Sequence, residues 1–312
     1  MRASPAYNEM VKKAYWALGA LLIVGFLAGF LILGDRYNTS LRSTTPEGGT
    51  SSGKYEDTVE ASPAAEVNTP PTLTPTPGIV LPPIHPNERS VRVPVLLYHY
   101  VSDNPNKEDR ARDGLSTPPD TFKAQLATLK AAGYSTITFD ELAAFFDGTS
   151  TLPSKPVILT FDDGYSDFYF NAYPILAASG MKGIAFISTG LIGGDAYMTW
   201  SQVEEIARSP AVVVGAHSVH HYVLTKSSSE VLKSELEVSK QKLEQHAGYP
   251  VNWVAYPYGT FDDRVVSAAR SAGYVGAVTT LPGSSQYKSR LYHIPRFRAG
   301  RRVGEDLLRL IE

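Results

Sequence analysis

The sequence predicts an α/β domain with a parallel sheet over residues 91–312, and three observations support this prediction. Short runs rich in Val, Ile, Leu and Phe alternate about seven times with stretches of helical periodicity. The runs at 157–161 and 183–187 are almost entirely apolar, which is typical of strands buried on both faces. Polar residues follow directly after several runs. The alternation fits either a barrel or a doubly wound sheet.

Capping and breaking residues mark the boundaries of the elements. Strands are predicted at 93–99, 135–139, 157–161, 183–187, 211–215, 251–256 and 275–279, with 291–298 as a further candidate. Helices are predicted at about 122–129, 141–146, 166–179, 202–208, 230–246, 262–271 and 304–311. Asp140 is the expected N-cap of the second helix, and Gly133 and Gly273 end the first and the sixth.

The N-terminal part of the chain predicts a membrane anchor. Residues 14–33 carry no charged side chain, and about 20 such residues span the roughly 30 Å hydrocarbon core of a bilayer. Lys12 and Lys13 precede this run, so the positive-inside rule leaves residues 1–13 in the cytoplasm and exports the rest. Because residues 34–36 make a poor cleavage site, we expect an uncleaved single-pass anchor in the cell membrane rather than a cleaved signal peptide.

Residues 34–90 are rich in Thr, Ser, Pro and Gly, a composition typical of a disordered and extended linker. A spacer between an anchor and a folded domain suits an extracellular protein that works away from the bilayer, for example within a cell wall. Residues 91–312 then form one catalytic domain, which is long enough to bury a sizeable core.

Composition excludes several classes of site and partner. The chain has no cysteine, which rules out disulfides and cysteine-ligated metals. Its formal net charge of −2, with charges of both signs, argues against a nucleic-acid or anionic-membrane binding face. We expect a monomer.

Two adjacent acids stand at the end of the apolar run at 157–161. Asp162 and Asp163 are followed by Gly164, which allows the chain to turn, and consecutive strand positions point to opposite sides. We therefore expect the two carboxylates to have different roles. The alternative is a polar loop in which Asp163 caps the helix that begins near Ser166.

Further polar residues occupy the carboxyl ends of other predicted strands: His99, His217, His221 and Tyr258. In a parallel barrel these ends converge on one face, so residues distant in sequence become neighbours. This common placement predicts a single site that contains these residues together with both acids.

Two of these histidines have metal-binding spacing. His217 and His221 stand four residues apart, which places both imidazoles on one side of a helical turn, whereas His220 would point away. Two histidines and one carboxylate form a common catalytic zinc set with an open position for water. The ligand types also suit cobalt, nickel or iron. A second, unligated carboxylate beside such a metal is the expected general base.

The sequences TFDDG at 160–164 and HSVHH at 217–221 resemble two motifs of the polysaccharide deacetylases, the NodB-homology group of carbohydrate esterases. The resemblance covers nearly the whole domain and implies a distorted (β/α)7 barrel. It also implies that Asp162 is the general base and that Asp163, His217 and His221 bind one divalent metal ion, zinc being expected.

The remaining motifs depart from the family's commonest pattern. The chain has AYPYG at 255–259 where many members have RPPYG, so the arginine that usually contacts the base is missing there, and Arg296 is a possible substitute. Two histidines fit the motif of the general acid. His99 is preferred because it ends a fully apolar strand, whereas His293 lies in a mixed one.

The early Tyr-His pair, the YPYG sequence and Trp200 are similar to the branch that removes N-acetyl groups from poly-N-acetylglucosamine in biofilms. The resemblance implies hydrolysis of N-acetyl groups on a β-linked N-acetylglucosamine polymer of a biofilm, of peptidoglycan or of a chitin-like glycan. The backbone N–H of Tyr258 would stabilise the oxyanion, and Tyr165, Trp200 and Tyr258 could stack on sugar rings.

Two other functions fit parts of the sequence. The same metal chemistry could remove O-acetyl groups from xylan or another acetylated glycan. A catalytically inactive glycan-binding protein anchored in the wall is a different class, which the intact set of base, ligands and acid argues against.

Overall fold

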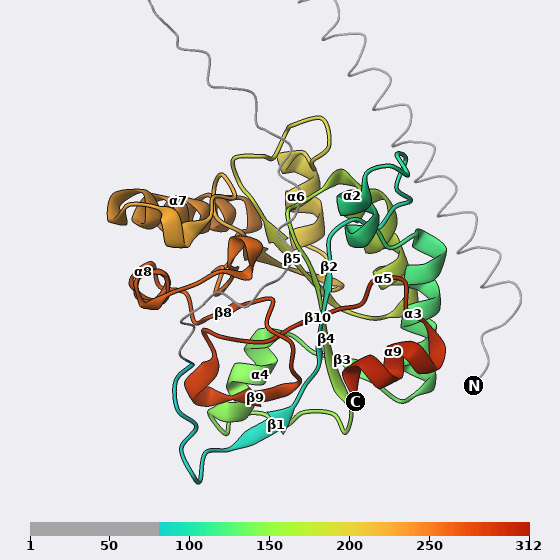
Figure 1. Cartoon of the computed structure of the whole chain (residues 1–312), viewed down its shortest axis with the longest axis horizontal. Helices are drawn as coiled ribbons and strands as arrows, with labels where there is room; N and C mark the ends of the chain where they lie inside the picture. Colours follow the sequence, from blue (N-terminus) through green and yellow to red (C-terminus); the bar gives the residue numbers. More distant parts are fainter. Residues whose placement is uncertain (1–80) are drawn as a thin grey trace, which may run out of the picture. The chain divides into compact units, whose positions relative to one another are not determined.

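The computed structural model describes residues 81–312 (Figure 1). The predicted cytoplasmic N-terminus at 1–13, the anchor at 14–33 and most of the linker lie outside these residues. Within residues 81–312, no helix is both long and apolar enough to cross a membrane.

The domain is built on one curved sheet in which every pair of neighbouring strands is parallel. Its order is β10-β2-β4-β5-β6-β7-β8, with β3 paired to β4. The strands are β2 (Val95–Tyr98), β3 (Ser135–Thr136), β4 (Pro156–Phe161), β5 (Gly183–Ile187), β6 (Val212–Ala216), β7 (Trp253–Ala255), β8 (Gly276–Val278) and β10 (Phe297–Arg298). The predicted parallel α/β fold is confirmed.

Residues 294–298, called the closing segment below, bond to β8 at one end of the strand order and to β2 near the other end. The backbone N–H of Thr279 donates to the carbonyl of Ile294 at 2.9 Å, beside β8, while β10 pairs with β2. Only Phe297–Arg298 of the candidate strand at 291–298 is a strand. Pro295 has no N–H to donate. The backbone N–H of Arg296 still donates to the carbonyl of Leu281, beyond β8, and pairing with β2 begins at Phe297.

Helices pack around the sheet (Figure 1). They are α2 (Arg110–Leu115), α3 (Pro119–Ala131), α4 (Phe139–Phe146), α5 (Tyr173–Ser179), α6 (Trp200–Ala207), α7 (Ser229–Ala247), α8 (Asp263–Ser271) and α9 (Gly304–Ile311), with a π-helical turn, η1 (Phe168–Ala172), before α5. Apolar side chains on one face of α7, including Leu232, Leu236 and Leu243, are buried as predicted.

Alternate residues of the strands belong to two hydrophobic clusters, because successive side chains point to opposite faces. One cluster joins the outer face of the sheet to α3, α5, α6, α7, α8 and α9. The other joins the inner face, including Val95, Ile158, Phe186 and Trp253, to α4. The inner face is therefore filled with apolar side chains along most of its length, which leaves its carboxyl end for polar groups.

Three local features differ from the predictions. Thr138 rather than Asp140 is the N-cap of α4, in a reciprocal capping box with Glu141. Asp140 instead accepts a hydrogen bond from the indole N–H of Trp253 at 2.8 Å. Helix α2 and an antiparallel ribbon of β1 (Ser90–Arg92) and β9 (Ser285–Tyr287) were not predicted.

Contacts with the domain begin upstream of residue 91. The backbone N–H and hydroxyl of Ser289 donate to Glu88, at 2.5 and 2.7 Å, and Arg290 donates to the carbonyl of Pro82 at 3.0 Å. The last residues of the predicted linker are therefore attached to the folded unit.

Close packing at Gly276 generates a stability prediction. A Cβ atom at this position of β8 would lie 2.3 Å from Cζ3 of Trp253 and 2.4 Å from the backbone oxygen of Leu291. Gly276→Ala should lower the free energy of unfolding by about 1–3 kcal/mol, because the core is overpacked. Urea unfolding measures this loss.

Gly114 in α2 is the matched control, since no atom lies within 4 Å of its hypothetical Cβ. Gly114→Ala should change the free energy of unfolding by at most about 1 kcal/mol, in the stabilising direction. Equal effects of the two substitutions would contradict the packing argument.

Candidate active site

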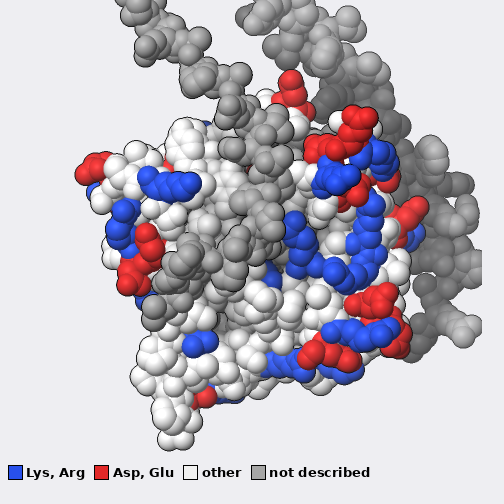
Figure 2. Space-filling view, viewed as in Figure 1, with Lys and Arg blue, Asp and Glu red and all other residues white. Residues whose placement is uncertain are grey.

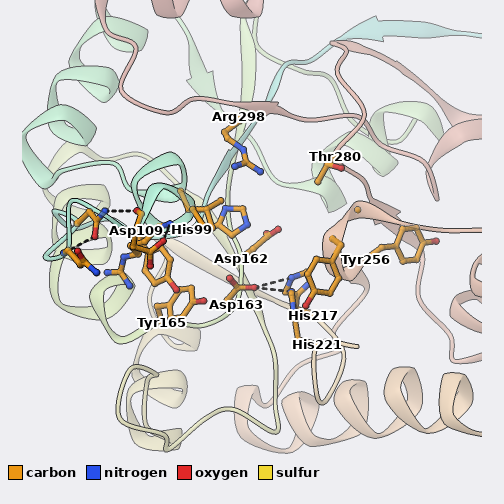
Figure 3. A pocket seen from close by; sticks show the side chains of 18 of the residues that line it. His99, Asp109, Asp162, Asp163, Tyr165, His217, His221, Tyr256, Thr280 and Arg298 are labelled. Carbon is orange, nitrogen blue, oxygen red and sulfur yellow. Dashed lines mark hydrogen bonds and ion pairs between the residues drawn. The ribbon is translucent and has the colours of Figure 1, made fainter. Parts of the chain in front are cut away.

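A pocket of about 510 Å³ lies at the carboxyl ends of the strands (Figure 3). Its lining includes residues from six separate parts of the chain, among them the predicted site residues His99, Asp162, Asp163, Tyr165, His217, His221 and Tyr258. The predicted convergence of strand ends on one site is confirmed.

The alternation of the strands explains which residues reach this pocket. Every second residue of a strand points to the same face of the sheet. Three such series lead to the pocket, namely positions 95, 97 and 99, positions 158, 160 and 162, and positions 213, 215 and 217. The first positions of these series contribute to the apolar cluster on the inner face. Their last members, His99, Asp162 and His217, are the polar residues that rise above that cluster into the pocket.

Asp163, His217 and His221 form a compact set of potential ligands. Nε2 of His217 and Nε2 of His221 lie 3.2 and 3.3 Å from Oδ1 of Asp163, an oxygen that is buried and has no hydrogen-bond partner. Nδ1 of His217 lies 2.7 Å from the carbonyl oxygen of Ala255. Because a carbonyl only accepts, this nitrogen carries the proton and Nε2 presents a lone pair. One carboxylate and two imidazoles fit a divalent metal ion.

Backbone strain is concentrated beside these ligands. Among residues 81–312, the only non-glycine residues with positive φ are Asp163 (79°), Ser218 (63°), His221 (59°) and Tyr258 (60°). Such conformations are uncommon and cost on the order of 1–3 kcal/mol each unless the surroundings impose them. The geometry of the ligand set is therefore imposed by the fold around it.

Glu235 of α7 supports the turn that carries the two histidines. Its buried carboxylate accepts hydrogen bonds from the backbone N–H groups of Val219 and His220, at 2.9 and 2.8 Å. The imidazole of His220 also contacts this carboxylate, at 2.6 Å, and does not line the pocket. His220 thus points away from the ligand set, as predicted.

Asp162 is held by a buried arginine. Arg296 makes a bidentate ion pair with both carboxylate oxygens, at 2.7 and 2.8 Å, and its Nε donates to the carbonyl of Thr279 at 2.8 Å. Burial alone would raise the pKa of Asp162, but the guanidinium outweighs this effect and holds the pKa below its usual range. The contact expected between Arg296 and Asp162 is present, and it keeps this carboxylate ionised.

The two candidate acid histidines lie in different environments. His99 is half-buried and lines the pocket. Burial lowers its pKa, while Asp163 and Asp162 act in the opposite direction. His293 is buried outside the pocket lining, with its ring centre 5.0 Å from that of Phe261, and burial lowers its pKa to about 4. Only His99 is placed with the other site residues.

Two of the three aromatic residues expected at the site line the pocket. Tyr165 stacks on Tyr100, with ring centres 3.9 Å apart, and Tyr258 is 38% exposed. Trp200 does not line this pocket, and its contact with a sugar ring stays a prediction. Its ring stacks on His246 of α7 at 4.0 Å, a contact between two helices that the local sequence does not reveal.

Sequence reasoning missed the other residues of the pocket wall, among them Tyr100, Arg112 and Arg298. Tyr100 directly follows His99, and Arg298 lies two residues after Arg296 on the same side of an extended segment. Both signals were available in the sequence. Arg112 belongs to the short helix α2, which has no buried residues and hence no apolar periodicity to predict it.

The contacts of Glu235 lead to a second stability prediction. Glu235→Ala should lower the free energy of unfolding by about 2–4 kcal/mol, because two backbone N–H groups lose a charged and buried acceptor. Glu237→Ala is the control, since this residue of the same helix makes only a surface ion pair with Lys233 at 3.9 Å. Urea unfolding compares the two, and equal losses would contradict the assigned role of Glu235.

Comparison with known proteins identifies the family. Residues 149–277 match the pattern of the family described as Polysaccharide deacetylase. YxkH of Bacillus subtilis (strain 168) is 29% identical over 211 residues, 68% of this chain and 72% of that protein. The poly-beta-1,6-N-acetyl-D-glucosamine N-deacetylase of Escherichia coli (strain K12) is 30% identical over 162 residues, 46% of this chain and 24% of that protein.

The solved structure of the Streptococcus pyogenes deacetylase PplD in complex with acetate is similar to this chain, with a TM-score of 0.67 and 30% identity. The match covers 72% of this chain and 100% of that one. The chain therefore belongs to the polysaccharide deacetylase family of hydrolases.

Proposed function

We propose that this protein is a metal-dependent hydrolase that removes N-acetyl groups from a β-linked N-acetylglucosamine polysaccharide. The observation that carries the proposal is the arrangement of Asp163, His217 and His221 beside a separate carboxylate, Asp162, which is paired with Arg296. The name of the Escherichia coli relative supports the same substrate class. We also propose that the curved sheet is the distorted (β/α)7 barrel of this family.

Asp163, His217 and His221 would hold the metal ion, for which zinc is expected and cobalt, nickel or iron are acceptable. When bound, such an ion supplies Lewis acidity, which polarises the acetyl carbonyl and lowers the pKa of water. The lone pair on Nε2 of His217 is directed to this position by the hydrogen bond between Nδ1 and Ala255.

Asp162 would act as the general base. Its carboxylate accepts a proton from the water molecule whose oxygen attacks the carbonyl carbon. Arg296 keeps Asp162 ionised and holds both of its oxygens in place, so Arg296 is a positioning residue in this mechanism. The backbone N–H of Tyr258 would donate to the oxyanion that forms.

His99 would act as the general acid. Cleavage of the carbon–nitrogen bond releases acetate and an amine, and the amine nitrogen takes the proton from the imidazolium of His99. Burial lowers the pKa of this imidazole, which makes its protonated form a stronger donor. Tyr165 and Tyr258, at the wall of the pocket, would contact the sugar rings.

A location outside the cell membrane completes the proposal. The uncharged run at 14–33 would anchor the chain, and the linker that follows would let the catalytic domain reach a wall or matrix polymer. Biofilm poly-N-acetylglucosamine, peptidoglycan and chitin-like glycans all have the required acetamido group.

Acetate release from these three polymers by the full chain tests the function. We expect release that stops with a chelator and returns with zinc. Asp162→Asn should reduce kcat by about 10²–10⁴-fold, because the general base is lost, and still bind zinc. Near-normal turnover by this variant, or activity that resists the chelator, would contradict the mechanism. Urea unfolding checks that the variant is folded.

His99→Ala and His293→Ala distinguish the two candidate acids. The first should lower kcat by about 10²–10⁴-fold, since no other imidazole in the pocket wall is available to protonate the amine once His217 and His221 bind metal. The second should keep a kcat close to that of the wild type, because His293 lies outside the pocket lining. Acetate release under saturating glycan measures both, and the reverse order would assign the acid to His293.

A further inference from the structure

A second arginine of the closing segment lines the pocket. Arg296 and Arg298 are two residues apart on an extended chain, so their side chains lie on the same side. Arg296 is fully buried and paired with Asp162. Arg298 lies one step nearer the carboxyl end of the sheet, where it is half-buried in the pocket wall.

Arg298 has no carboxylate partner. Within residues 81–312 no Asp or Glu oxygen lies within 4 Å of its guanidinium, and the carboxylate of Asp162 is already engaged by Arg296 on both oxygens. Burial lowers the pKa of Arg298, although the group remains charged at neutral pH. A half-buried cation that lacks a counterion favours an anion from outside the chain.

Arg112 adds a second guanidinium to the same pocket wall. Its Cζ lies 3.3 Å from the ring centre of Tyr100, one terminal nitrogen donates to the hydroxyl of Ser102 at 3.1 Å, and its Nε is buried without a partner. It too makes no ion pair within the described part of the chain. Asp109 also lines the pocket, but its carboxylate caps α2 by accepting from the backbone N–H of Arg112 at 2.9 Å.

Arg298 lies away from the place where the reacting acetyl group would bind. Figure 3 shows Arg298 on one side of the pocket and Asp163, His217 and His221 on the other, with His99 and Asp162 between them. An acetamido group placed at the three ligands would leave Arg298 to contact another part of the same glycan.

The surface near the closing segment carries charges of both signs. On the right of that face, where Figure 1 places α2 and the segment that leads to α9, Figure 2 shows Lys and Arg side chains with Asp and Glu side chains beside them. That segment includes Arg301 and Arg302, and Arg301 pairs with Asp113 of α2 at 2.7 Å.

We infer, on the basis of the proposed function, that Arg298 binds an anionic group of the glycan, a carboxylate or a phosphate, on a sugar next to the one that is deacetylated. The substrate is then an acidic N-acetylated glycan, and Arg112 assists at the same subsite. A cationic glucosamine at this position would be repelled, so a largely deacetylated chain is a poor substrate.

The experiment compares acetate release by the full chain from three sets of β-linked oligosaccharides of equal length. One is neutral N-acetylglucosamine, one alternates N-acetylglucosamine with a carboxylate-bearing sugar, and one carries phosphate groups. We expect kcat/KM for at least one acidic glycan to exceed the neutral value by about tenfold to a hundredfold, since charge-assisted hydrogen bonds are lost with the neutral glycan. The acidic glycan that shows the advantage identifies the anion.

Arg298→Gln should reduce this ratio to about one, and Arg298→Lys should give an intermediate ratio because a single ammonium replaces the planar fork. Arg302→Gln, a change at an exposed arginine four residues further along the chain, should leave the ratio unchanged. Methyl esterification of the carboxylate glycan tests the wild-type protein directly and should remove the advantage of that glycan, whether or not the variants fold.

Equal turnover of neutral and acidic glycans by the wild type would overturn this inference and leave the proposed function intact. An equal loss on both glycans in Arg298→Gln would also overturn it. Acetate release from none of the glycans would instead contradict the proposed function itself.

Discussion

The buried ion pair between Asp162 and Arg296 is the interaction on which the architecture and the site both depend. It links the end of β4 to the closing segment, and Arg296 also donates to the carbonyl of Thr279, just after β8, and to the hydroxyl of Thr160, at 2.8 and 3.1 Å. A buried ion pair offsets its desolvation only when its geometry is good and its remaining groups are bonded. Here both carboxylate oxygens are engaged, and the guanidinium bonds to groups of β4, at the end of β4 and just after β8. The contact that joins the two sides of the sheet therefore also fixes the ionisation state of Asp162.

The ligand set depends on a different constraint, which is backbone strain at the ligands that the surrounding fold imposes. Asp163 and His221 adopt left-handed backbone conformations that their side chains disfavour. The turn between His217 and His221 is held by Glu235, a charged acceptor that α7 places below it. The buried leucines of α7 fix the helix against the core. The helix in turn fixes Glu235, and Glu235 holds the turn that carries the two imidazoles. Helix packing thereby maintains a local geometry that the turn would not adopt alone.

Sequence reasoning succeeded where the apolar pattern of a single strand is enough to predict the residue at its end. The period of two places Asp162 above Ile158 and His217 above Val213, so the apolar pattern of each strand predicts what lies at its end. It failed where a position depends on contacts between distant elements. The local sequence does not reveal the stacking of Trp200 on His246, and helix α2 has no buried residue to create a pattern. The change of partner after Arg296 shortened the last strand for the same reason, since the closing segment bonds first beside β8 and then to β2. The predicted anchor at 14–33 lies outside the described residues.

The same period of two accounts for the different environments of Arg296 and Arg298. One guanidinium lies at the level of Asp162, where it is enclosed and its charged partner is the carboxylate of Asp162. The other is displaced along the strand by two residues, roughly 6.6 Å at the rise typical of parallel strands, and so reaches the pocket. At that depth no carboxylate of residues 81–312 pairs with the guanidinium, which leaves the cation available to a ligand. Depth along a strand, rather than residue type, therefore decides whether an arginine of this segment stabilises the fold or is available to bind a ligand.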